Sequence, residues 1–197
     1  MSQKQLNRAQ RRKLETRQKI LNAAASLLTQ RGYPDLTVRA ITEEADIGYG
    51  TFYLHFSDKD DVVWELISVI LEQTDTVINE QVSNLDFPQK EYARLLIFFD
   101  LVGKNKIQFL TVLGKNSSPT LAYRYRETVA KLTTQNFKEN NYQNRFVDVP
   151  LEVMANFYSG AMLRLVVWWL ETESQYTSEQ MAQMVFKMAF PTQELPF

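Results

Sequence analysis

The amino-acid sequence predicts an all-α fold of about nine helices. Apolar residues recur at three- and four-residue spacing in successive stretches of the 197-residue chain, as they do on the buried side of a helix. Gly, Pro or polar runs separate these stretches. A chain of this length can bury about 70% of its unfolded surface in one domain, so its core needs no disulfide or metal.

The first helix is expected over about residues 13–31, and residues 1–12 are expected to form a flexible basic arm because they hold few apolar groups. Gly32 ends this helix as a left-handed C-terminal residue. Arg17 and Lys19 are assigned to its more exposed side. Its apolar stripe contains Ile20, Ala24, Leu27 and Leu28.

Residues 37–56 predict two short helices joined by a tight turn. The Thr37 hydroxyl can accept a hydrogen bond from an unpaired backbone N–H one turn on, which makes Thr37 a suitable N-cap. Ile41 and Ala45 lie on one apolar stripe of the helix that follows. Asp46 can adopt the left-handed conformation that such a turn needs.

The second of these helices, expected over about residues 49–56, has an outward face without an acid. Phe52 and Phe56 lie four residues apart and face inward. The outward set is Tyr49, Gly50, Thr51, Tyr53, Leu54 and His55. Such a face can approach a polyanion closely and aim donors at phosphates and base edges. A core helix with a few polar tips is the alternative interpretation.

Residues 37–60 resemble the DNA-binding motif of the tetracycline-repressor-like (TetR) family. The matching residues are Thr51, Phe52, Tyr53, His55, Phe56 and Lys59. Two positions depart from the family pattern: Asp46 stands where Gly is usual, and Gly48 where a capping Ser or Thr is frequent. The motif match covers roughly the first third of the chain; the rest agrees with the family only in length and helical character.

The resemblance implies a basic arm and helix-turn-helix domain over residues 1–57 and a ligand-binding and dimerisation domain over 58–197. A helix over about 58–82, with Ser57 as N-cap and Asp60 at its third position, would link the two. The implied DNA contacts are Thr37, Arg39, Gly48, Tyr49, Gly50, Thr51, Tyr53, His55 and Lys59.

Three of these contacts have structural alternatives. Arg39 can form a surface ion pair with Glu43, four residues on. His55 can be a buried, hydrogen-bonded histidine, and Lys59 an exposed lysine beside acidic neighbours.

Charge is distributed unevenly along the chain. Residues 1–40 hold nine Lys and Arg against two acidic residues, which gives +7, so the other 157 residues carry −8 of the net −1. A basic head on an acidic body is typical of a protein whose head alone meets nucleic acid. The arm either only solubilises the chain or lies along phosphates or in a minor groove.

Composition argues against several classes of function. The chain has no cysteine and one histidine, so we expect no metal site, no cofactor, no catalytic residue and no enzymatic activity. Its polar start and the absence of disulfides favour a cytoplasmic protein. The most apolar stretch, 161–170, is short for a membrane span and contains Arg164, so no membrane association is expected.

Further helices are expected over about 89–102, 107–113 and 119–139. Ser118 would cap the last of these and Pro119 would occupy its first turn. The predicted 58–82 helix has an apolar face made of Val62, Leu66, Val69, Ile70, Val77 and Ile78.

The last two helices are expected over about 150–173 and 178–190. Thr177 and Gln180 form a capping box for the second. The first is apolar around most of its circumference, so a second subunit is expected to cover part of it, making a homodimer. The predicted dimer contacts are Leu165, Trp169, Met184 and Met188.

The resemblance also implies a small-molecule pocket among helices rich in aromatic residues. Its predicted lining is Phe98, Phe109, Tyr123, Tyr125, Phe157, Tyr158 and Met162, which would suit a largely apolar or aromatic effector. The function predicted is a ligand-responsive repressor that binds a near-palindromic operator as a homodimer. An all-helical carrier or enzyme with an incidental basic head, or a ligand-independent DNA binder, are the alternatives.

Overall fold

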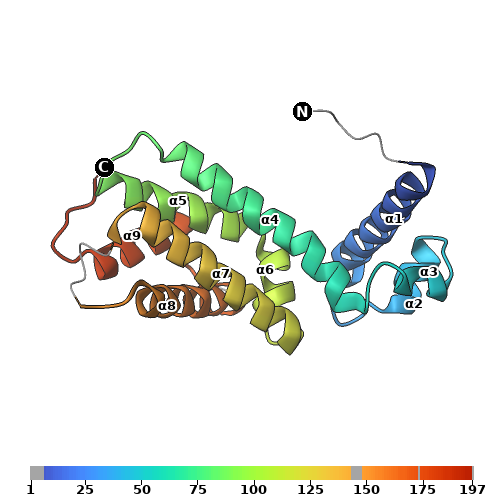
Figure 1. Cartoon of the computed structure of the whole chain (residues 1–197). Coiled ribbons are helices and arrows are strands. Elements are labelled where there is room, and N and C mark those ends of the chain that lie inside the picture. The colour runs from blue at the N-terminus through green and yellow to red at the C-terminus, as the bar shows by residue number, and fades with distance from the viewer. Residues whose placement is uncertain (1–6, 143–147, 173, 197) are drawn as a thin grey trace. The chain divides into compact units, whose positions relative to one another are not determined.

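The computed structural model describes residues 7–142, 148–172 and 174–196, and within them it contains helices and no strand (Figure 1). This confirms the all-α class. The helices are α1 Arg8–Arg31, α2 Val38–Glu44, α3 Tyr49–Tyr53, α4 Lys59–Gln81, α5 Gln89–Lys104, α6 Lys106–Leu113, α7 Pro119–Glu139, α8 Leu151–Glu171 and α9 Ser178–Ala189.

The chain divides into two compact units, Met1–Ile70 and Leu71–Phe197, called the first and second unit below. The division falls inside α4, so this helix contributes its first half to one unit and its second half to the other. The first unit contains α1, α2 and α3, and the second contains α5 to α9.

Helix α1 begins earlier than predicted. The Asn7 side chain accepts from the Gln10 backbone N–H at 2.8 Å, and the Gln10 side chain accepts from the Asn7 N–H at 2.9 Å. This reciprocal cap starts the helix at Arg8, so the prediction of a flexible segment was wrong for residues 8–12. The rest of the predicted arm lies outside the described residues. At the other end, Gly32 takes a left-handed φ of 76°, as predicted.

The core of the first unit confirms the predicted inward positions of α1, α2 and α3. Its buried side chains include Ile20, Ala24, Leu27, Ile41, Phe52, Phe56, Val62 and Val63. Asp46 forms the turn between α2 and α3 with φ 52°. Helix α3 ends at Tyr53, earlier than predicted, because the Leu54 N–H bonds to the Thr51 carbonyl three residues back and tightens the last turn.

Helix α4 differs from its prediction at both its cap and its face. Asp58, not Ser57, supplies the cap, accepting from the Asp61 N–H at 2.9 Å. The Asp61 carboxylate accepts from the N–H of Ser57, the residue before the cap, at 3.2 Å. The predicted apolar face is buried only in part: Val69, Ile70 and Val77 are exposed.

The second unit is built on two helix pairs. Helix α5 packs against α9, and α7 packs against α8, while α6 contacts α7 and α8. Between them lies a core made of Tyr92, Phe99, Val102, Val166, Trp169, Leu170, Met181, Ala182, Val185 and Phe186. The predicted caps of α7 (Ser118 with Pro119) and α9 (Thr177 with Gln180) are present.

Helix α8 is, among the described residues, the one helix long and apolar enough to cross a membrane by length and composition. It is longer than the 161–170 stretch singled out from the sequence. Its Ala155, Leu163 and Val166 are buried against neighbouring helices. A core helix of a folded domain passes the same test, so this property is weak evidence for a membrane span.

Candidate nucleic-acid interface and effector region

Helix α3 presents aromatic and small residues to solvent while its inner side is anchored. Phe52 is fully buried and contacts both Phe56 and Tyr53 through its ring. Tyr49 and Tyr53 are exposed, and so is Leu54 just after the helix. The predicted outward face is therefore present, with Thr51 and His55 half-buried at its edges.

Two predicted contacts lie next to α3 and are already engaged within the unit. The Thr37 hydroxyl accepts from the Ala40 N–H at 3.1 Å and caps α2 as predicted. The Arg39 Nε donates to Glu43 Oε1 at 2.8 Å, and this bond with the Glu43 charge raises the pKa of Arg39. Both side chains of this pair are exposed, and such surface pairs contribute little, so Arg39 can exchange Glu43 for a phosphate at small cost.

Gly48 and Gly50 flank the start of this surface. Gly48 is the N-cap of α3 and offers no side-chain hydrogen bond there. A Cβ added at Gly50 would have no atom within 4 Å. The backbone at both positions is therefore open to a close ligand.

His55 is half-buried, and its Nδ1 is buried without a hydrogen-bond partner among the described residues. Burial lowers the pKa of the imidazole, and the positive charges of Arg17 and Lys13 lower it further. These effects favour the neutral imidazole, which can contact a phosphate through a hydrogen bond.

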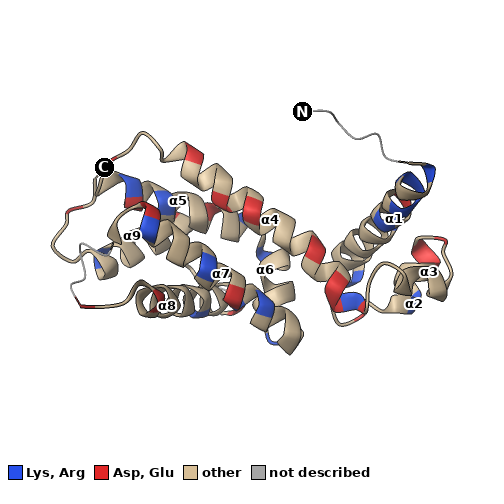
Figure 2. Ribbon diagram, viewed as in Figure 1, with Lys and Arg blue, Asp and Glu red and all other residues tan. Residues whose placement is uncertain are grey.

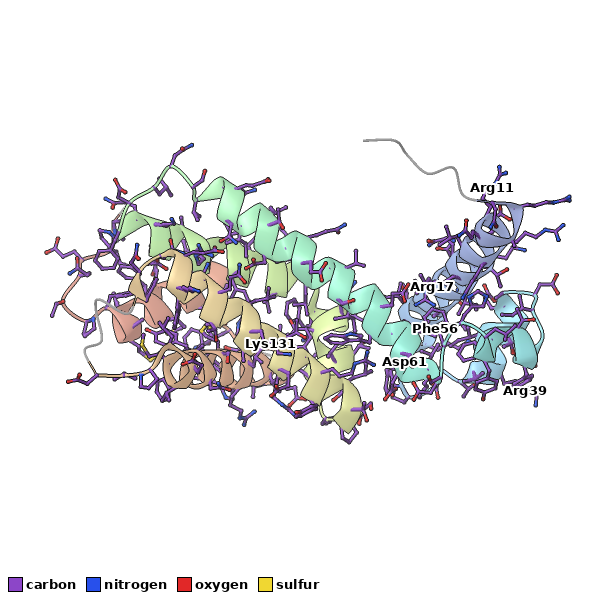
Figure 3. The ribbon with its side chains drawn as sticks, in the orientation of Figure 1. Arg11, Arg17, Arg39, Phe56, Asp61 and Lys131 are labelled. Carbon is purple, nitrogen blue, oxygen red and sulfur yellow. The ribbon has the colours of Figure 1, made fainter. Side chains whose placement is uncertain are left out.

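Arg17 connects three segments of the first unit (Figure 3). Its Nε donates to Glu65 Oε1 at 2.8 Å and its Nη2 to Glu65 Oε2. Its Nη1 donates to the His55 carbonyl oxygen at 2.8 Å, and the guanidinium lies 4.1 Å from the centre of the Phe56 ring. We call α3 and the residues that follow it up to Phe56 the α3 segment. Arg17 thus ties α1 to α4 and to the end of this segment.

The sequence interpretation missed this role and assigned Arg17 to the exposed side. The available signal was spacing: Arg17 precedes Ile20 by three residues and Ala24 by seven, which places it on the buried stripe of α1.

Lys59, predicted as a DNA contact, forms hydrogen bonds within the first unit. Its amine donates to the Leu36 carbonyl at 2.8 Å and to the Tyr33 carbonyl at 3.4 Å, and it lies 4.1 Å from the centre of the Tyr33 ring. It therefore holds the loop between α1 and α2 to the start of α4. A phosphate would have to compete with these backbone acceptors for its charge.

Some of the predicted pocket residues lie inside the second unit. Phe109 of α6 contacts Tyr125 of α7 edge-on, with ring centres 6.4 Å apart. Tyr125 is buried, which raises the pKa of its hydroxyl. Phe98 of α5 and Met162 of α8 pack against the main core. These four residues come from four helices.

The other predicted pocket residues lie at or near the surface. Tyr123 is 60% exposed and Phe157 73% exposed, so neither points into the unit. The buried positions near them are Ala122 and Tyr125 on α7 and Ala155 and Ser159 on α8. Tyr158 is half-buried and contacts the Phe137 and Phe157 rings.

The predicted dimer contacts are divided between core and surface. Trp169 is buried in the core of its own subunit, where its Nε1 donates to the Tyr176 carbonyl at 2.9 Å and its ring meets Phe99. Leu165 and Met184 are partly buried on the same core, whereas Met188 is exposed. The exposed residues of α8 instead include a stripe at helical spacing that is apolar apart from one arginine, the α8 outer stripe: Val153, Phe157, Gly160, Ala161, Arg164 and Trp168.

A partly buried polar cluster that the sequence interpretation did not identify lies in the second unit. Arg94 Nη1 donates to Asn79 Oδ1 at 2.8 Å, and the Asn79 amide donates to Asp75 at 3.0 Å. The Asn136 amide oxygen, turned toward the guanidinium, accepts from Nη1 at 2.8 Å and from Nη2 at 3.2 Å.

The guanidinium of this cluster has no carboxylate in hydrogen-bonding contact. Arg94 Nε is buried without a hydrogen-bond partner in the described residues, and Glu91 Oε2 lies 4.0 Å away. Burial raises the pKa of Asp75, although Arg94 acts against that shift.

In the described part of the chain, no three acidic or histidine side chains gather where they could hold a metal ion.

Two family models match this chain. The model described as bacterial regulatory proteins, tetR family, matches residues 20–66, and the model described as a transcriptional regulator C-terminal region matches residues 91–191. The first match contains α2, α3 and the exposed tyrosines, and the second contains the helix pairs of the second unit.

Among curated proteins, the chain is similar to the HTH-type transcriptional regulator HbdR of Aromatoleum sp. (strain CIB). The two are 32% identical over 74 residues, which are 38% of this chain and 32% of HbdR. The chain thus spans about a third of that relative's length.

Two solved structures share the fold. One is described as a TetR-family transcriptional regulator from Syntrophomonas wolfei, with TM-score 0.68 and 22% identity over 89% of this chain and 93% of that one. The other is Thermus thermophilus FadR, a TetR-family repressor in complex with lauroyl-CoA, with TM-score 0.71 and 18% identity over 92% and 98%. At these identities the likeness shows the fold alone.

Proposed function

The chain belongs to the tetR family of bacterial regulatory proteins, and from this premise we propose that it is a DNA-binding transcriptional regulator that responds to a small ligand. One observation carries the proposal. Helix α3 exposes Tyr49 and Tyr53 and no acid, while Phe52 beneath them is fully buried. A fixed helix with hydroxyls and aromatic edges on its outer side is suited to reading base edges in a major groove.

The regulator would act as a homodimer inside the cell, where the DNA is. The α8 outer stripe and Met188 of α9 offer apolar side chains, and Gly160 with Ala161 lets a second backbone approach closely. Two-fold pairing would set two copies of α3 one helical turn of DNA apart, about 34–36 Å, on a near-palindromic operator.

The effector would occupy the second unit and release the DNA, which makes the protein a repressor. Phe98, Phe109, Tyr125 and Met162 supply an apolar lining from four helices. The similar FadR structure holds lauroyl-CoA, a ligand with a long apolar chain. A largely apolar or aromatic effector therefore fits, and no step of this function requires enzymatic turnover.

A selection from a pool of random duplexes, followed by mobility-shift assays, tests the proposal. We expect a near-palindromic sequence to be enriched. Tyr53→Ala should bind the selected sequence about five- to 150-fold more weakly, because a lost base contact costs about 1–3 kcal/mol. Tyr123→Ala, which removes an exposed tyrosine of the second unit, is the matched control and should bind normally.

Three outcomes would count against the proposal. Failure to enrich any sequence would contradict specific DNA binding. Sedimentation as a monomer at high concentration would contradict the dimer. A thermal shift with no response to any apolar compound would favour a ligand-independent DNA binder instead.

A further inference from the structure

The helix-turn-helix segment itself carries no excess of positive charge. Residues 37–56 contain Arg39 against Glu43, Glu44 and Asp46, a net charge of −2. Helix α3 contains no charged residue at all. The contacts that give sequence-independent affinity for DNA are charge contacts to phosphates. Those contacts must therefore come from another part of the first unit.

Two of the cations elsewhere in this unit are already in use. Arg17 binds Glu65 and the His55 carbonyl, and Lys59 binds the Leu36 and Tyr33 carbonyls. The remaining charge is concentrated on α1, where six Lys and Arg besides Arg17 stand against Glu15, a net charge of +5. Figure 2 shows the blue positions gathered on the first half of this helix.

The basic residues at the start of α1 are exposed and take part in none of the ion pairs between described residues. They are Arg8, Arg11, Arg12 and Lys13. Arg11 lies in the first turns of the helix, as labelled in Figure 3. Their side chains are thus available to an anion outside the chain.

The basic residues in the first turns of α1 destabilise the helix when it is considered by itself. The first turn of α1 contains no acid, although the helix dipole favours negative charge there. Arg8 and Arg12 are like charges four residues apart, which also destabilises a helix. The Asn7 and Gln10 capping box holds the helix in place nonetheless. A stretch that breaks local rules without an internal gain is expected to serve a function.

The exposed cations occupy two sides of α1. Arg8, Arg12 and Lys19 recur at intervals of four and seven residues and share one stripe, which also holds Glu15. Lys13 lies on the other side, one turn before Arg17, whose guanidinium donates to the His55 carbonyl. The basic surface therefore reaches the end of the α3 segment that faces DNA in the proposed function.

We infer that the first three turns of α1 form a phosphate-binding surface for duplex DNA, using Arg8, Arg11, Arg12 and Lys13. The inference rests on the proposed function. On this surface the guanidinium and ammonium groups neutralise backbone phosphates beside the bases that α3 reads. Helix α1 supplies sequence-independent affinity, and α3 supplies the choice of sequence.

The test measures how binding of a random-sequence duplex of defined length depends on salt. The variant is Arg8→Gln/Arg11→Gln/Arg12→Gln, in which Gln keeps helix propensity. Each lost phosphate contact lowers the slope of log K against log salt by about 0.9, so three contacts lower it by about 2.7 for each bound protomer. The control is Lys106→Gln/Lys115→Gln/Lys131→Gln, the same charge change at exposed positions of the second unit.

The outcomes separate the inference from the function on which it rests. A slope reduced in the α1 variant and unchanged in the control supports the inference, as does recovery of the slope in Arg8→Lys/Arg11→Lys/Arg12→Lys. An unchanged slope in the α1 variant, or an equal fall in the control, overturns the inference and leaves the proposed function in place. Wild-type protein that binds no duplex overturns both.

Discussion

The two units of the molecule hold a partly buried arginine in different ways. In the first unit, Arg17 donates to both oxygens of Glu65 and to the His55 carbonyl, so its guanidinium is well satisfied. In the second unit, Arg94 is more deeply buried but is held by the amides of Asn79 and Asn136, with Glu91 4.0 Å away.

This difference agrees with the functions proposed for the two units, DNA binding for the first and effector binding for the second. A guanidinium bound bidentately to a carboxylate has one favourable arrangement, so Arg17 fixes the end of the α3 segment. A buried guanidinium with amide partners and a free Nε can exchange partners when the surrounding helices move. We expect the first unit to behave as a rigid DNA-binding unit and the second to tolerate rearrangement around a ligand.

The strongest way to break this comparison is Arg94→Met. The side chains of Arg94 and Glu91 are 17% and 10% exposed, so the change leaves Glu91 buried without its cation. The amide oxygens of Asn79 and Asn136 lose their donor as well, and a buried polar group left without its partner costs about 1–3 kcal/mol. Urea unfolding followed by circular dichroism should show a loss of this size, and Arg94→Met/Glu91→Leu should recover part of it.

The control lies on the same helix. Lys104 and Asp100 form a pair four residues apart whose side chains are 69% and 51% exposed. Such pairs contribute about 0.3–0.5 kcal/mol, so Lys104→Met should have little effect. Equal losses in the free energy of unfolding for Arg94→Met and Lys104→Met would show that the Arg94 cluster contributes no more to stability than an exposed ion pair.

A smaller effect is expected from Arg17→Lys in the first unit. Lys keeps the charge but cannot bind both oxygens of Glu65 and the His55 carbonyl together. Because Arg17 and Glu65 are 34% and 30% exposed, solvent offsets part of the loss, and we expect about 1–2 kcal/mol. Amide hydrogen exchange at His55 and Phe56, whose N–H groups both bond to the Phe52 carbonyl, should accelerate accordingly.

Lys19→Met, an exposed cation on the same helix, is the reference for this measurement. Exchange at Phe56 that is unchanged in Arg17→Lys, or changed equally in both variants, would contradict the bracing role. Faster exchange should be accompanied by weaker binding of the selected operator, since a looser α3 segment must be ordered on the DNA.

What could be predicted from the sequence was local. The Thr37 cap, the inward Phe52 and Phe56, and the caps of α7 and α9 all depend on residues within a few positions of each other. Arg17 and Glu65 are 48 positions apart, and Arg94 and Asn136 are also far apart in the sequence, so no periodicity reports their pairing. Helix α8 is apolar on several sides, and hydrophobicity alone did not indicate that Trp169 faces the core while Trp168 and Phe157 face outward.

The smallest effect concerns His55, the single histidine of the chain, whose ring signals are therefore unambiguous in an NMR titration. Burial, Arg17 and Lys13 place its pKa below the ordinary 6.5, so the unfolded chain binds this proton more readily than the folded one. The contribution of neutral His55 to stability is thus complete above pH 6.5 and is lost as pH falls through 6.5 toward the lower folded value.

His55→Gln should remove this part of the pH dependence of urea unfolding. Arg17→Met should raise the pKa of His55 by removing a nearby positive charge. A pKa at or above 6.5 in the wild-type protein would contradict the effect of burial and of the two positive charges, Arg17 and Lys13, on His55.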